Sequence, residues 1–221
     1  MKEQEITLSR IYTDVHRTLK GAIQNKMKFK LLNESALEGI SKNLLLDLNA
    51  RVLQDPTAIS TTYIYTISRS FKAIFFYRLA NYLYCLDSED LFFKSCAYRL
   101  SEYATARTMI EIHPQAKIGH SFVIDHGVNT LIGATCEIGN NCTFLNNIVL
   151  GSKKITYNEN KKRHPTIGDN VHISSGAKIF GAICIGNNVI IGPDCVITEN
   201  IPNDKIVKLK KTQMVISSVK K

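Results

Sequence analysis

The sequence predicts an α+β protein that is mainly β. An all-helical N-terminal domain is expected over residues 1–110, a parallel β-helix over residues 111–200 and a basic tail over residues 201–221. Two observations predict this division. Of the 12 glycines only Gly21 and Gly39 precede residue 110. Apolar residues recur at helical spacing before that point and every six residues after it.

Helical spacing accounts for the N-terminal part. The first apolar face consists of Ile11, Val15 and Leu19. Ser35 and Glu38 have the spacing of a capping box, which predicts that a second helix begins there. This helix should end before Pro56, because a residue that precedes proline is pushed out of the helical region. Further helices are expected over residues 71–82 and 88–104.

A period of six governs the second part. It is interrupted by a two-residue slip after the third member and by a gap after the seventh. Its members are Ile112, Ile118, Ile124, Ile132, Ile138, Phe144, Leu150, Ile167, Ile173, Ile179, Ile185, Ile191 and Ile197. Helices and hairpin sheets do not have this period, whereas a β-helix with three six-residue faces per coil stacks such residues inside. The repeats suffice for roughly four coils.

Cysteines and the gap in the repeat have separate meanings. Cys136, Cys142 and Cys195 each lie four residues after a repeat position, a slot that predicts core thiols and not nucleophiles. None of the 6 cysteines forms a CxxC pair, so the sequence predicts no metal site.

The gap in the repeat is an inserted loop over residues 151–166 that is polar and basic. Insertions in a solenoid project from its wall, where function is concentrated.

Charge and hydropathy exclude several functional classes. The chain has 28 Lys and Arg residues against 19 Asp and Glu residues, a net charge of +9, with no cluster of basic and aromatic residues typical of nucleic-acid binding. A polyanionic small molecule suits this diffuse charge better. No uncharged apolar segment is long enough to predict a membrane span. The charged N-terminal segment does not resemble a signal peptide, so a cytoplasmic location is expected.

His126 is a candidate general base. It lies where the repeat slips by two residues, and a break in regular structure can present an imidazole to a cleft. Glu111 precedes it by nearly one coil, so stacking would bring the carboxylate close enough to orient the ring. From spacing alone, a surface turn residue without catalytic function is an equally good interpretation of His126.

Several stretches resemble the short form of the serine O-acetyltransferase family. They are QDPTA (54–58), FYRLANYLY (76–84), EIHPQAKIG (111–119), IDHG (124–127), RHPTIGDNVHISSGAKIFG (163–181) and IGNNVIIGPDCVI (185–197). The resemblance implies a left-handed β-helix and transfer of an acetyl group from acetyl-CoA to L-serine, a step of cysteine biosynthesis. It further implies direct attack by the substrate hydroxyl, with no covalent enzyme intermediate and no metal.

The resemblance also assigns roles to residues. It makes His126 the general base and Glu111 its orienting carboxylate, although aspartate is usual at the second position. It implies that Asp55 and Asp125 bind the substrate ammonium. The substrate carboxylate is expected to meet Arg163 and His164, so that His164 also belongs to the catalytic site.

Coenzyme A is expected in a groove between neighbouring β-helices of a trimer or hexamer. The expected contacts are Gly151, Ser175, Gly176, Lys178 and Gly192, with Lys208 as a further candidate. Long-form relatives end in an isoleucine that enters the active site of O-acetylserine sulfhydrylase. This chain ends in Lys220 and Lys221, so a cysteine synthase complex is not expected.

Two other functions fit the repeat. A sugar or polysaccharide O-acetyltransferase would have the same fold, and so would a non-catalytic trimeric scaffold. The charged residues discriminate between them, because an amino acid needs both an acidic and a basic group, whereas a neutral sugar hydroxyl needs neither. A scaffold would leave His126 and His164 without a role.

Overall fold

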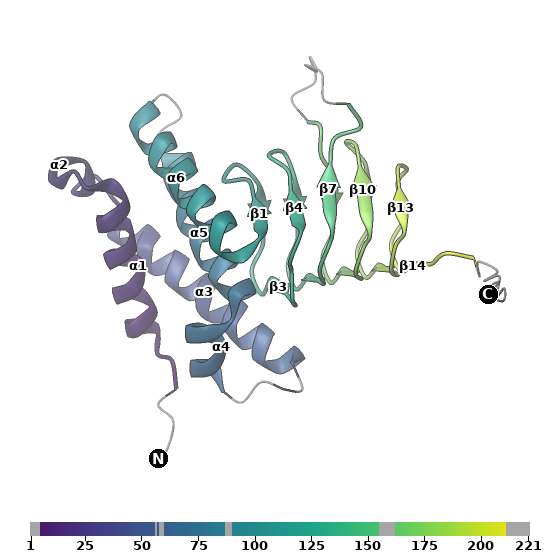
Figure 1. Cartoon of the computed structure of the whole chain (residues 1–221), viewed down its shortest axis with the longest axis horizontal. Coiled ribbons are helices and arrows are strands. Elements are labelled where there is room, and N and C mark those ends of the chain that lie inside the picture. The colour runs from purple at the N-terminus through teal and green to yellow at the C-terminus, as the bar shows by residue number, and fades with distance from the viewer. Residues whose placement is uncertain (1–4, 56, 58–59, 87–89, 155–161, 211–221) are drawn as a thin grey trace, which may run out of the picture.

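The computed structural model describes residues 5–55, 57, 60–86, 90–154 and 162–210. Within these ranges six helices are followed by 14 short strands. The helices gather at one end, and the strands wind away from them as a parallel solenoid (Figure 1). This confirms the predicted fold class, an all-helical N-terminal region followed by a left-handed parallel β-helix.

The helices bury the faces that the sequence predicts, and Ile11, Val15 and Leu19 have no exposed surface. The helices are α1 (Leu8–Ile23), α2 (Lys26–Phe29), α3 (Glu34–Gln54), α4 (Thr61–Ile67), α5 (Arg69–Leu86) and α6 (Leu91–Thr108). The predicted start of α3 at Ser35 is wrong. Asn33 is the N-cap, because its side-chain oxygen accepts the N–H of Ala36 at 3.3 Å. The helix ends at Gln54, as the following proline requires.

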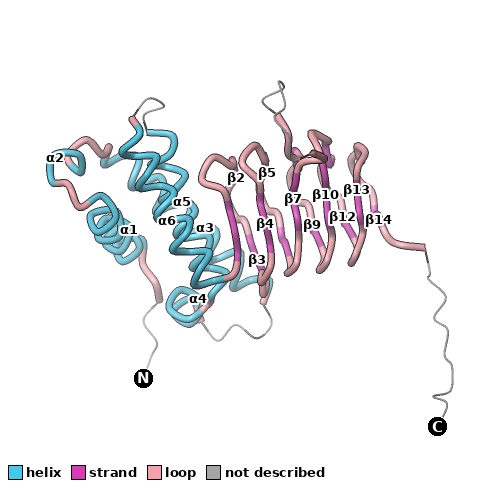
Figure 2. The backbone as a smooth tube through the Cα atoms, turned by 45° about the horizontal axis from the view of Figure 1, so that its top comes forward, coloured by secondary structure: helices cyan, strands magenta, loops and turns pink. Residues whose placement is uncertain are grey.

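The strands form three parallel sheets, which are the three faces of the solenoid (Figure 2). Sheet A contains β1 (Ile110–Ile112), β4 (Thr130–Ile132), β7 (Val149–Gly151), β10 (Lys178–Phe180) and β13 (Val196–Ile197). Sheet B contains β2 (Lys117–Ile118), β5 (Glu137–Ile138), β8 (Thr166–Ile167) and β11 (Cys184–Ile185). Sheet C contains β3 (Val123–Ile124), β6 (Thr143–Phe144), β9 (His172–Ile173), β12 (Ile190–Ile191) and β14 (Ile206–Val207).

The period of six determines the register. In sheet A each repeat position pairs with the one on the next strand, in the order Ile112, Ile132, Leu150, Ile179 and Ile197. The slip after Ile124 and the inserted loop both fall between strands, so neither disturbs the stacking. Sheets A and C have five strands each, one more than the roughly four coils expected. In sheet A the fifth strand arises because the repeat positions begin and end on this sheet, at Ile112 and Ile197. In sheet C the fifth strand is β14, which continues the solenoid into the segment that the sequence assigns to the tail.

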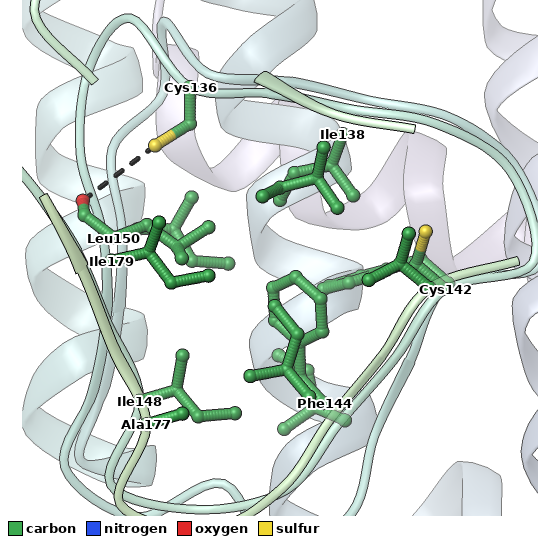
Figure 3. Close-up of a cluster of buried hydrophobic side chains, with 14 of the residues drawn as sticks. Cys136, Ile138, Cys142, Phe144, Ile148, Leu150, Ala177 and Ile179 are labelled. Atoms are coloured by element: carbon green, nitrogen blue, oxygen red, sulfur yellow. Dashed lines mark hydrogen bonds between the residues drawn. The ribbon is translucent and has the colours of Figure 1, made fainter. Parts of the chain in front are cut away.

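The stacked residues form the interior of the solenoid, which Figure 3 shows in cross-section. Cys136, Cys142 and Cys195 are buried among them, which confirms the prediction for these thiols. Burial raises the pKa of the Cys142 thiol to about 11 and raises that of Cys136 as well. A thiol that stays protonated is a poor nucleophile, so these residues serve packing.

A ladder of side-chain acceptors runs along the corner between sheets B and C. The backbone N–H of His120 donates to Oδ1 of Asn140 at 3.0 Å. The N–H of Asn140 donates to Asp169 at 2.6 Å, that of Asp169 to Asn187 at 2.8 Å, and that of Asn187 to Asn203 at 2.8 Å. Each coil is therefore fastened to the next by the same hydrogen bond.

A buried ion pair joins the helices to the first coil. Arg78 on α5 donates two hydrogen bonds of 3.0 Å to the carboxylate of Asp47 on α3. Its remaining donors reach the carbonyl oxygens of Ile118 at 2.6 Å and Gly119 at 2.5 Å. Asp47 in turn accepts the N–H of Phe122 at 2.8 Å. Burial raises the pKa of the Asp47 carboxyl, and the Arg78 guanidinium opposes that shift.

No helix among the described residues combines the length and the apolar character that a membrane crossing requires.

Candidate active site

His126 lies at the corner between sheets C and A, in the turn that carries the two-residue slip. Its φ of 59° and that of Gly127, 80°, place both residues in the left-handed region. The turn folds against the start of β1, since the N–H of Asn129 donates to the carbonyl of Met109 at 2.8 Å. The imidazole is 76% exposed, and its Nε2 lies 3.8 Å from Oδ2 of Asp125. A reacting hydroxyl can therefore reach the ring from solvent.

An arginine occupies the space between the two predicted ammonium ligands. Nη2 of Arg51, in the last turn of α3, lies 2.9 Å from Oδ2 of Asp55 and 2.7 Å from Oδ1 of Asp125. Hydrogen bonds from Thr57 lower the pKa of the Asp55 carboxyl, and the Arg51 charge adds to this effect. Both acids and His126 are thus brought together at the C-terminal end of α3.

Glu111 points out from β1, beside the turn that holds His126. Among the described residues no hydrogen bond or ion pair joins its carboxylate to the imidazole. The orienting role of Glu111 therefore stays a prediction.

A second cluster lies at the corner between sheets A and B. His164 and Arg163 precede β8, and both backbone N–H groups donate to the hydroxyl of Thr135, at 3.1 and 2.9 Å. The His164 ring packs over Gly133, where a Cβ atom would lie 2.2 Å from it. Arg163 Nη2 donates to Ser152 Oγ at 3.2 Å across the base of the inserted loop, of which residues 155–161 lie outside the described ranges.

The tautomer of His164 follows from these contacts. The N–H of Thr135 points at Nδ1 of His164 at 3.2 Å, so Nδ1 is an acceptor and the proton of the neutral ring lies on Nε2. Burial lowers the pKa of His164, and the nearby positive charge of Arg163 lowers it further. The ring is therefore a neutral N–H donor suited to a carboxylate oxygen.

The structure does not bring the two clusters together within one chain. Asp55, Asp125 and His126 lie at the corner between sheets C and A, whereas Arg163 and His164 lie across sheet A from them. In Figure 1 the chain leaves β7 at its upper end, where the inserted loop begins, whereas β3 is labelled at the lower side of the solenoid. Within one chain, sheet A therefore separates the two clusters.

Comparison with known proteins identifies the family. No family model matches the sequence. A serine acetyltransferase of Bacillus licheniformis is 39% identical over 180 residues, which cover 81% of this chain and 80% of the relative. The chain belongs to the serine acetyltransferase family. Solved structures agree with this assignment. Serine acetyltransferase isoform 3 of Entamoeba histolytica in complex with cysteine matches with a TM-score of 0.76 and 33% identity, over 96% of this chain and 72% of that chain. Neisseria gonorrhoeae serine acetyltransferase in complex with serine matches with a TM-score of 0.74 and 29% identity, over 95% and 85%.

Most residues predicted to contact the coenzyme lie on the same edge of this family member as His126. Ser175 and Gly176 form the turn between β9 and β10, and Gly192 follows β12 at the next coil. Lys178 is on β10, with its ammonium 3.4 Å from the carbonyl of Gly176. Gly151 instead ends β7 at the corner between sheets A and B, next in the chain to Ser152, whose hydroxyl accepts a hydrogen bond from Arg163. Lys208 is exposed after β14.

Two further residues of the candidate site, Arg51 and Thr135, were not predicted from the sequence. Arg51 precedes Asp55 by four residues, so an ion pair on one helical face was a detectable signal. Thr135 carries no such signal, because its partners lie 28 and 29 residues away, beyond the inserted loop. No group of three or more potential metal ligands occurs in the described part of the chain.

Replacement of Thr135 by valine should weaken binding of the substrate that receives the acetyl group. Valine lacks the hydroxyl that accepts hydrogen bonds from the backbone N–H groups of Arg163 and His164 and lies 2.8 Å from Nδ1 of His164. We expect KM for the acceptor to rise about tenfold while kcat changes less, because the loss concerns substrate positioning. Steady-state kinetics check this, with Thr135→Ser as the matched control that keeps the hydroxyl. An unchanged KM in Thr135→Val would show that Thr135 does not position His164.

Proposed function

We propose that this chain transfers the acetyl group of acetyl-CoA to the hydroxyl of L-serine, yielding O-acetyl-L-serine and CoA in cysteine biosynthesis. The observation that carries the proposal is the position of His126. Its exposed ring adjoins the acidic residues at the end of α3 and shares one corner of the solenoid with Ser175, Gly176 and Gly192. The proposed base, the ammonium ligands and the expected coenzyme contacts therefore lie along one corner of the solenoid. The serine complex of the Neisseria gonorrhoeae relative supports the choice of acceptor.

The transfer proceeds by direct attack. The imidazole of His126 accepts the proton of the serine hydroxyl as its oxygen attacks the thioester carbonyl. The C–O bond forms, the C–S bond breaks, and the thiolate of CoA takes the proton back from the imidazolium. Glu111 orients the ring, and the acidic cluster of Asp55 and Asp125 receives the serine ammonium. Arg163 and the Nε2–H of His164 bind the carboxylate.

Both clusters are needed for one serine molecule, so we propose that neighbouring chains of a trimer share each site. His126 and Asp125 come from one chain, and Arg163 and His164 from the adjacent chain. Coenzyme A lies in the groove between them, with its phosphates near Lys178 and Lys208. A hexamer of two such trimers has the same shared sites.

Mixing two inactive variants tests the shared site. His126→Ala and Arg163→Ala each lose activity alone, but a mixed trimer contains interfaces at which both wild-type residues meet. After denaturation and refolding together, the mixture should regain about a quarter of the wild-type activity. Variants refolded separately and then combined without denaturation are the control. A mixture that stays as inactive as its components would place the whole site in one chain.

The acceptor is tested by thiol release from acetyl-CoA with L-serine, L-homoserine and simple sugars offered separately. We expect release with L-serine that matches the O-acetyl-L-serine formed, as measured by chromatography. Release with a sugar alone would favour the polysaccharide alternative, and a trimer without any release would favour the scaffold.

A further inference from the structure

The cluster at the end of α3 consists of Arg51, Asp55 and Asp125, so it contains a positive charge in addition to the two carboxylates expected to bind an ammonium group. Two carboxylates and one guanidinium meet there, and the Arg51 side chain is only 10% exposed. A single nitrogen, Nη2, contacts both Asp55 and Asp125. A positive nitrogen of the chain itself therefore already occupies the place between the two carboxylates.

The oxygens of the two acids are not equally available. Oδ1 of Asp55 accepts the N–H of Thr57 at 2.8 Å and its hydroxyl at 2.6 Å, and Oδ2 of Asp55 faces Arg51. Oδ1 of Asp125 also faces Arg51. Of the four carboxylate oxygens, Oδ2 of Asp125 is the one that faces neither Arg51 nor Thr57 among the described residues, and it lies 3.8 Å from Nε2 of His126. The Asp125 side chain is 31% exposed, compared with 13% for Asp55.

We propose that Arg51 is a specificity-determining residue that divides the work of the two acids. Asp55 anchors Arg51, Arg51 holds Asp125, and Oδ2 of Asp125 alone receives the ammonium of the acceptor, next to the catalytic base. The inference deepens the proposed function and rests on it. With Arg51 present the cluster carries one net negative charge, and without it two. Arg51 therefore limits how strongly the site prefers an acceptor that has an ammonium group.

The experiment compares L-serine with 3-hydroxypropanoate, which has the same hydroxyl and carboxylate but no amino group. The measured quantity is the ratio of kcat/KM for the two acceptors, because general damage to the site affects both values and cancels. In Arg51→Leu the freed carboxylates should raise this ratio at least about fivefold. Arg51→Lys keeps the charge and should stay within about twofold of the wild type. Arg10→Leu removes a surface arginine of α1 that pairs with Asp14 and controls for net charge.

The two acids provide an independent test that does not need Arg51→Leu to fold. Asp125→Asn should lower the ratio at least about tenfold, and Asp55→Asn by less than about threefold, because only Asp125 touches the ammonium. Equal losses in both variants would overturn the division. So would an unchanged ratio in a folded Arg51→Leu, or its loss of turnover with both acceptors. A wild type that does not acetylate L-serine would overturn the proposed function itself, and the inference with it.

Discussion

Replacement of His126 by alanine should lower kcat by at least about 100-fold, since general-base catalysis typically supplies between about 10² and 10⁴ in rate. The ring is exposed and its only ion-pair partner among the described residues is Asp125 at 3.8 Å, so its removal leaves no cavity. The far-ultraviolet circular dichroism and the melting temperature should stay close to those of the wild type. Thiol release under saturating acetyl-CoA and L-serine measures the loss.

Two variants provide the controls for His126. His120→Ala removes another exposed histidine at a corner of the first coil and should keep nearly full activity. Glu111→Gln should lose less activity than His126→Ala, because an orienting group contributes only part of the effect of the base. If Glu111→Gln were fully active from about pH 6 to 9, Glu111 would have no part in catalysis. A His126→Ala variant with more than a third of the wild-type activity would remove His126 from the mechanism.

Replacement of Asp47 by alanine should lower the free energy of unfolding by about 3–5 kcal/mol, because it leaves the buried guanidinium of Arg78 without its counter-ion. The side chains of Asp47 and Arg78 are 0% and 8% exposed, so water cannot substitute for the lost carboxylate. The variant also loses the acceptor for the N–H of Phe122. The chain has no tryptophan, so urea unfolding is best followed by circular dichroism at one fixed protein concentration.

Glu137→Ala is the matched control for Asp47. Glu137 pairs with Lys117 at 3.6 Å and Lys162 at 3.5 Å on the surface, and its loss should cost less than about 1 kcal/mol. The double variant Asp47→Leu with Arg78→Met should recover part of the loss, because it removes both charges. Equal destabilisation in Asp47→Ala and Glu137→Ala would show that the buried pair does not fasten the helices to the first coil.

The interior of the solenoid could be predicted almost residue by residue. Inward-facing residues at a fixed spacing leave one way to stack, so Ile112, Ile132 and Leu150 fall into register without knowledge of the turns. The start of α3 was less accessible, because Asn33 and Ser35 are both good N-caps and the choice depends on tertiary packing. The continuation as β14 was missed because the coil before it is two residues shorter, which breaks the period.

The candidate site was only partly accessible from sequence. Motifs identified Asp125, His126 and the Arg163–His164 pair, because each is contiguous in the chain. Contacts that cross between elements could not be found in this way. Arg51 meets Asp125 across 74 residues, and Thr135 meets His164 across the inserted loop. The separation of His126 from Arg163 and His164, which lie at two different corners, depends on how the solenoid winds, and no local sequence pattern encodes that.

The ladder of hydrogen bonds from Asn140 to Asn203 joins the coils in a row, so we expect local unfolding to start at the end of the solenoid that is farthest from the helices. Each coil depends mainly on its neighbours, as in a one-dimensional array, and the first coil is clamped to the helices by Asp47 and Arg78. We therefore expect local opening to begin at the far coils and protection against hydrogen exchange to decrease along the axis. The proposed base, His126, belongs to the coil that is attached to the helices, whereas the turn at Gly192 belongs to one of the far coils, which are expected to open more easily. We therefore expect the position of His126 to vary little, whereas the turn at Gly192, on the same corner of the solenoid, can adjust to a long and flexible ligand.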